Sequence, residues 1–180
     1  MKRTPLLALF FAFFTATAAL SYAAPAPNTQ YQEINALYKQ GQYASALDQV
    51  NAYITQNPQD AQARFLKGLI LTAQNQYPEA IKSFTSLTED FPELPEPYNN
   101  LAVLYAAQGQ YENAKNALQM AINAHPNYAT AQENLGDIYA KMAALAYEKA
   151  TQLDHQNTSA QNKLTLIKAL LVSNIAPNPK

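Results

Sequence analysis

Gln40-Gly41-Gln42-Tyr43 is the first of three near-identical segments, followed by Gln74-Asn75-Gln76-Tyr77 and Gln108-Gly109-Gln110-Tyr111, each 34 residues after the one before. Two further residue types keep the same spacing, namely Pro58, Pro92 and Pro126, and Ala46, Ala80 and Ala114. A fixed period of about 20 to 50 residues is typical of proteins built from stacked repeats. The chain is therefore expected to be an array of 34-residue units.

The third unit indicates what each repeat forms. A first helix is predicted from apolar residues at helical spacing, Tyr98, Leu101, Ala102 and Tyr105. Gly109 is expected to end this helix, because glycine adopts a left-handed conformation at little cost. A second helix is predicted from Ala114, Leu118, Ala121 and Ile122, and Pro126 blocks its continuation. Each unit is thus predicted to be a helix hairpin that buries its apolar face by stacking on its neighbours.

Over residues 27–157 the chain resembles the tetratricopeptide-repeat (TPR) family, which has the same 34-residue period. The family's small residue at position 8 of a unit is matched by Gly68, Ala102 and Gly136, and its large residue at position 24 by Phe84, Leu118 and Tyr147. The resemblance implies an all-α, right-handed superhelical solenoid of antiparallel helix pairs. Its units would span residues 27–60, 61–94, 95–128 and a shortened 129–157.

The shortened fourth unit lacks the turn segment. Nineteen residues separate Gly136 from His155, which stands where the other units have proline, against 24 in the second unit. The missing residues are those of the turn, and residues 141–145 continue without Gly or Pro. We expect residues 130–153 to form one long helix. A hairpin with a cramped corner, or a kink that restores ordinary stacking, is the alternative.

A C-terminal capping helix is predicted after the fourth unit. Asn157-Thr158-Ser159 offers N-cap side chains, and an apolar face follows at helical spacing, formed by Leu164, Ile167, Leu170 and Leu171. Solenoids need such a helix to cover their last apolar face. The predicted organisation is a linker at 24–29, a single TPR domain at 30–174 that ends in the capping helix 158–174, and a disordered tail at 175–180.

The first 23 residues have the three parts of a secretory signal peptide. Lys2 and Arg3 are followed by an uncharged run, residues 6–20, and Ser21-Tyr22-Ala23 supplies small residues before Ala24. The run is shorter than the roughly 17–25 apolar residues of a membrane span. We predict cleavage after Ala23 and export to a periplasm, without stable membrane insertion afterwards; an uncleaved signal anchor is the alternative. The chain has no cysteine, which argues against a lipoprotein.

Composition argues against several functions. The net charge of −1 is unlike the basic balance of nucleic-acid binders. The absence of cysteine excludes thiolate metal sites and cysteine nucleophiles. The two histidines, His125 and His155, belong to no metal-binding or catalytic motif, so they are interpreted as loop residues. All four glycines have structural positions, two in turns and two, Gly68 and Gly136, at helix crossings. We predict no enzymatic activity, cofactor or metal.

In the TPR family the first helices of the units line a concave groove that binds ligands. Mapping the family's contact positions onto this chain predicts a protein- or peptide-binding groove formed by Tyr31, Asn35, Tyr38, Phe65, Leu69, Asn99, Asn100, Val103, Asn134, Asp137 and Lys141. Tyr31, Tyr38 and Phe65 are the expected exposed aromatic anchors. The alternative is that Tyr31 and Phe65 pack against each other. Most other tyrosines, including Tyr139, are assigned to packing.

These patterns predict a non-enzymatic scaffold or adaptor in the cell envelope that binds a protein or extended peptide of unknown identity. The amino-acid sequence of residues 95–157 resembles that of exported proteobacterial envelope TPR proteins, which favours an envelope partner. One alternative is a self-assembling module that forms a homo-oligomer through the terminal helix around Leu170. Another is an accessory factor of cell-wall enzymes.

Overall fold

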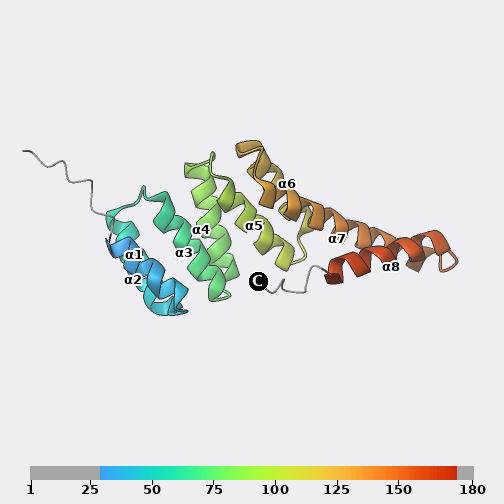
Figure 1. The fold of residues 1–180 in the computed structure, drawn as a ribbon, viewed down its shortest axis with the longest axis horizontal. Helices are drawn as coiled ribbons and strands as arrows, with labels where there is room; N and C mark the ends of the chain where they lie inside the picture. Colours follow the sequence, from blue (N-terminus) through green and yellow to red (C-terminus); the bar gives the residue numbers. More distant parts are fainter. Residues whose placement is uncertain (1–28, 174–180) are drawn as a thin grey trace, which may run out of the picture.

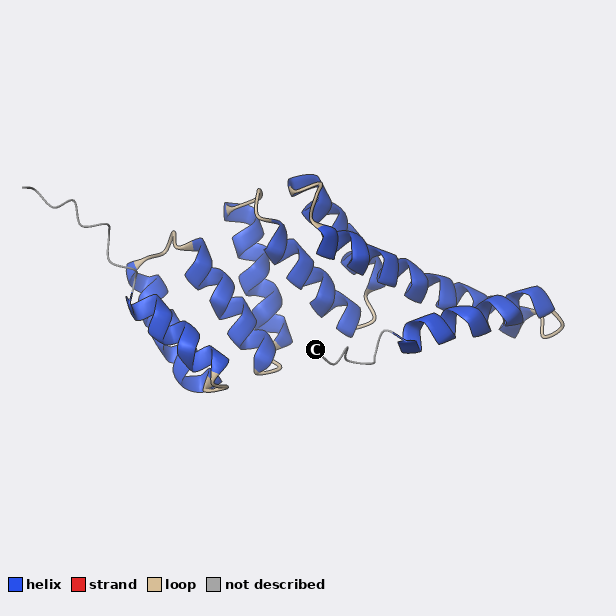
Figure 2. Ribbon diagram, in the orientation of Figure 1, coloured by secondary structure: helices blue, strands red, loops and turns tan. Residues whose placement is uncertain are grey.

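Eight α-helices make up the part of the chain that the structure describes. The computed structural model describes residues 29–173, and within this range short loops join the helices and no strand occurs (Figure 2). The predicted signal peptide and C-terminal tail lie outside the described residues. The helices are α1 (Thr29–Lys39), α2 (Tyr43–Gln56), α3 (Ala61–Ala73), α4 (Tyr77–Asp90), α5 (Pro95–Ala107), α6 (Tyr111–Ala124), α7 (Ala129–Leu153) and α8 (Thr158–Ser173).

The helices form hairpins that stack in chain order. Figure 1 shows α1 to α6 as three hairpins side by side, with the longer α7–α8 hairpin projecting at the C-terminal end. The all-α solenoid predicted from the 34-residue period is confirmed. None of the helices between residues 29 and 173 is long and apolar enough to cross a membrane.

The recurring turn segments share one backbone geometry. Gly41 and Gly109 have φ values of 76° and 72°, and Asn75 takes the same place with φ 59°. Asparagine is one of the few residues with a side chain that adopts this left-handed conformation readily. In the first turn the Gln42 amide donates to the Leu37 carbonyl at 2.9 Å, and the other two turns repeat this bond at the same length. The turn therefore ends the first helix and satisfies its last carbonyl groups.

The two helices of the second unit pack closely at Gly68. A Cβ atom placed on Gly68 would lie 2.5 Å from the ring of Phe84, which is 0% exposed. The same ring lies 5.5 Å from that of Phe65, centroid to centroid. Only glycine lets α3 and α4 approach this closely, so the predicted role of Gly68 at a helix crossing is confirmed.

The fourth unit departs from the other three. Residues 129–153 form the single helix α7 of 25 residues, without the turn that divides each earlier unit. No second helix folds back on its first half, and a Cβ atom on Gly136 would meet nothing within 4 Å. The expectation that Gly136 lies at a helix crossing is therefore wrong. The assignment of Tyr139 to packing is also wrong, because its side chain is 53% exposed.

Helix α8 returns along the second half of α7. The Asn157 side chain accepts a hydrogen bond from the Ala160 amide at 2.9 Å and so begins the helix. Lys168 pairs with Glu148 at 2.7 Å, and the Lys163 ammonium lies 5.7 Å from the centre of the Tyr147 ring. Ala160 is buried, and Leu164, Ile167 and Leu171 are half-buried, so this side of α8 faces α7.

Candidate peptide-binding groove

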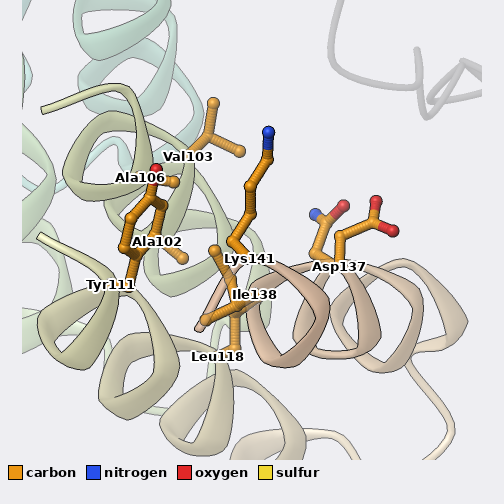
Figure 3. A pocket seen from close by; sticks show the side chains of 9 residues that line it. Ala102, Val103, Ala106, Tyr111, Leu118, Asp137, Ile138 and Lys141 are labelled. Carbon is orange, nitrogen blue, oxygen red and sulfur yellow. The ribbon is translucent and has the colours of Figure 1, made fainter. Parts of the chain in front are cut away.

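A cavity with a largely apolar lining lies where α5, α6 and α7 meet. It has a volume of about 290 Å³, and its walls are formed by Ala102, Val103, Ala106, Tyr111, Leu118, Asn134, Asp137, Ile138 and Lys141. The cavity exists because α5 contributes alanine at two of these places, which leaves space between the helices. In Figure 3, Val103 and the ammonium end of Lys141 lie on the far side of the cavity from Leu118.

A second cavity of about 360 Å³ continues from the first toward α8. The two cavities share Tyr111 and Lys141, and the second is completed by residues of α7 and α8, Ala144, Leu145, Glu148, Lys168, Leu171 and Val172. We call the two cavities together the C-terminal groove. Part of its rim is exposed apolar surface, because Val103, Leu145 and Val172 are each at least half exposed.

Three of the charged groups of the groove, Asp137, Lys141 and Glu148, lie on α7, and Lys168 lies on α8. Asp137 and Lys141 are one helical turn apart and line the first cavity, while Glu148 and Lys168 form the ion pair at the second. Most of the other lining residues are aliphatic, and the Tyr111 ring lines both cavities. This combination suits an apolar side chain that enters the cavity while polar atoms of the same ligand stay at the charged rim.

Four of the predicted groove residues surround the first cavity, namely Val103, Asn134, Asp137 and Lys141. The Asn134 side chain also donates a hydrogen bond to the Asn99 side chain at 2.7 Å, which ties α7 to α5. Asn99 is 8% exposed, so it lies beneath the surface and positions Asn134. Asn100 is half-buried and donates to the Glu96 carbonyl of its own helix.

The predicted aromatic anchors are all half-buried. Phe65 packs on Phe84, and Tyr38 lies 5.9 Å from Tyr43, ring centre to ring centre. The expectation that these side chains stand exposed is therefore wrong, because neighbouring helices cover one side of each ring. Tyr31 and Phe65 do line a separate cavity of about 420 Å³, which extends to Leu94 and Pro97 at the start of α5. Burial, and then the Asp60 carboxylate, raise the pKa of the Tyr31 phenol.

Two predicted residues, Asn35 and Leu69, are half-buried and line none of these three cavities. The predicted groove residues omit Ala102, Ala106, Tyr111, Leu118 and Ile138 of the first cavity. They also omit the residues that only the second cavity contains, above all Leu145, Leu171 and Val172. They meet only because α7 is straight and α8 returns beside it. The missing turn of the fourth unit was the signal that could have found them.

Between residues 29 and 173, no three His, Asp or Glu side chains come close enough together to hold a metal ion. His125 and His155 are exposed in the loops that follow α6 and α7.

Two family models match the chain, one over residues 31–95 and one over residues 71–135, and both describe the tetratricopeptide repeat. The chain belongs to the tetratricopeptide-repeat family. Together the two matches cover α1 to α6 and the beginning of α7, which includes all three turn segments.

Several known proteins are similar to this chain in sequence or in structure. The photosystem I assembly protein Ycf3 of Synechococcus sp. (strain CC9605) is 31% identical over 46% of this chain and 50% of its own. The TPR protein YrrB, whose crystal structure is described as having an unusual peptide-binding site, is 29% identical, with a TM-score of 0.55 over 58% of this chain and 54% of YrrB. The Yersinia enterocolitica chaperone SycD, solved with a peptide of YopD, has a TM-score of 0.60 over 68% of this chain and 98% of SycD at 19% identity. The chain spans half the length or less of the first curated relatives it matches.

Proposed function

We propose that this TPR protein is a non-enzymatic scaffold that holds an extended peptide segment of a partner protein in the C-terminal groove. The observation that carries the proposal is the pair of connected cavities with an exposed apolar rim, formed by Val103, Leu145 and Val172. Exposed apolar surface of this kind typically marks a binding site. YrrB, a TPR protein of similar sequence, is described as having a peptide-binding site, which supports the proposal.

The groove favours peptides with an apolar anchor residue. The first cavity offers the methyl groups of Ala102, Ala106 and Leu118 to such a side chain. The peptide on either side of the anchor would pass Asp137 and Lys141, whose charges can accept or donate hydrogen bonds. A ligand of this kind gains its affinity mainly from burying the anchor, and its direction from the charged rim.

Substitution of Val103 tests this site. Peptides are selected from a random phage-displayed library on the wild-type protein, and the affinity of the best peptide is measured by calorimetry. Val103→Asp places a charge on the apolar rim and is expected to weaken binding at least about tenfold, roughly 1.4 kcal/mol. Met120→Asp is the matched control, because Met120 is 48% exposed on α6 and Val103 is 50% exposed on α5. Met120 lies outside all of the cavities described above.

The two variants separate the site from general surface effects. The proposal requires that the Met120→Asp affinity equals that of the wild type while Val103→Asp binds weakly. If both variants bind the selected peptides as tightly as the wild type, the C-terminal groove is not the peptide site. The wild type and both variants should have equal circular dichroism spectra, which would show that any loss of affinity does not come from unfolding.

We further propose that the protein acts in the periplasm of a bacterial cell envelope. The support lies in the sequence, in the three-part leader pattern of residues 1–23. Exported protein is expected in the periplasmic fraction with Ala24 as its first residue, as read by mass spectrometry. Phe11→Arg together with Phe14→Arg interrupts the apolar run and is expected to retain the full-length chain in the cytoplasm. Equal fractionation of the variant and the wild type would refute export through this leader.

A further inference from the structure

The first half of α7 has a face that its equivalents in the earlier units do not expose. In the second unit, position 8 is Gly68, which packs under Phe84, and position 11 is Leu71, which is 4% exposed. The same positions of the fourth unit are Gly136, which meets nothing within 4 Å, and Tyr139, which is 53% exposed. In the first three units the second helix of the hairpin covers this face. No helix of residues 29–173 covers it in α7.

The chain does contain the residues that correspond to a covering second helix. They lie further along α7 itself, beyond the open face. In the second unit, positions 20, 24 and 27 are Ala80, Phe84 and Leu87, each 0% exposed against α3. After the five-residue deletion, the same positions in the fourth unit fall in the second half of α7, at Ala143, Tyr147 and Ala150. All three are only half-buried. Because α7 is one uninterrupted helix, its second half does not fold onto its first half within the same chain.

We propose that a second copy of this chain covers the open face, by antiparallel pairing of the two α7 helices. The second half of each α7 then takes, on the partner's first half, the place that α4 takes on α3. A twofold axis near Met142 relates the copies, so each contact occurs twice and the interface closes as a dimer. Gly136 faces the partner's Tyr147, as Gly68 faces Phe84. The occupant is identified by the chain's own repeat pattern, because the matching positions lie on the same helix.

Charge complementarity supports the same arrangement. Helix α8 corresponds to the first helix of a fifth unit that begins at residue 158. Ala160 is then at position 3 and is buried, as Ala131 is at position 3 of the fourth unit. Within the chain, position 6 of one unit contacts position 5 of the unit before it, through the bond from Asn134 to Asn99. For α8, position 6 is Lys163, and position 5 of the fourth unit is Glu133. In the dimer, Lys163 therefore lies opposite the partner's Glu133.

The dimer also accounts for exposed leucines of α8. Leu166 and Leu170 are 72% and 53% exposed. They lie three and seven residues after Lys163 and so share its side of the helix. Lys163 lies over Tyr147, and Tyr147 lies one turn from Ala143 on the open face of α7. The first half of the partner's α7 would lie against this side and cover both leucines.

Restoring the missing turn provides the main test. Inserting Gln-Gly-Gln-Tyr-Glu, copied from residues 108–112, between Lys141 and Met142 returns the fourth unit to 34 residues. The second half of α7 can then fold back on the first half within one chain. Light scattering after gel filtration is expected to give the wild type twice the chain mass, which is 19.8 kDa for the full chain, and the insertion variant one chain mass.

A point substitution keeps the test decisive if the insertion variant does not fold. The Cβ atom that Gly136→Lys adds meets nothing within 4 Å in the single chain, and the substitution improves helix propensity, yet it places a cation against the partner's helix. It is expected to be a folded monomer. Gln152→Lys is the control, since Gln152 is exposed on the opposite side of α7, and it should remain a dimer. Charge reversal at Glu133 should weaken the dimer, and Lys163→Glu in the same chain should restore it.

Either of two results overturns the proposal. One is a wild-type protein that has the mass of a single chain throughout the micromolar range. The other is a dimer that persists at wild-type affinity in Gly136→Lys, which would place the interface elsewhere. Neither result bears on the peptide site, because Val103 and the walls of the first cavity lie away from the open face of α7.

Discussion

Phe84→Ala is expected to lower the free energy of unfolding by about 3–5 kcal/mol. The Phe84 ring is 0% exposed, packs on Phe65 and fills the space above Gly68. Its removal leaves a cavity where α3 and α4 cross, and the glycine below cannot fill it. The ring also belongs to the cluster that continues into α5 and α6, so its loss should weaken the coupling between the second and third units.

Urea denaturation followed by circular dichroism measures this loss. Met120→Ala is the control, because an exposed side chain of similar size on α6 should change the free energy by less than about 0.5 kcal/mol. A loss of less than about 1 kcal/mol for Phe84→Ala would contradict the packing described here, because buried aromatic truncations rarely cost so little. A broadened transition would indicate that the second unit has become uncoupled from its neighbours.

The fold of this protein was predictable because its repeat positions have local causes. A turn needs a residue that accepts positive φ, and the chain has Gly41, Asn75 and Gly109 at one spacing. The absence of such a residue from residues 141–145 indicated a continuous helix, and α7 is one helix in the structure. Each of these inferences depends on the backbone conformation of a few neighbouring residues. The sequence states that information directly.

The candidate site was less predictable because it depends on how helices far apart in sequence meet. Asn99 was assigned to the groove surface, yet contact with α7 buries it and engages its side chain. Phe65 was expected to be exposed, but Gly68 leaves room for the Phe84 ring to approach closely and cover Phe65. Residues of α8 joined the groove only because that helix returns along α7. Such pairings follow from tertiary geometry, and a single sequence does not encode them locally.

The largest effect expected from adding atoms is that of Gly68→Leu, which should lower the free energy of unfolding by about 3 kcal/mol. The first added carbon already lies 2.5 Å from the Phe84 ring, and the ring cannot move aside because Phe65 lies 5.5 Å from it and solvent reaches neither face. Some compensation comes from helix propensity, since Leu favours a helix over Gly by up to about 1 kcal/mol.

Combining Gly68→Leu with Phe84→Ala distinguishes this clash from a general loss of helix packing. The new leucine can occupy the space that the ring leaves, so the double variant should be more stable than the sum of the two losses by about 1–3 kcal/mol. Strictly additive losses would mean that the two positions do not share the contact, and that α3 and α4 are held apart by something other than this ring.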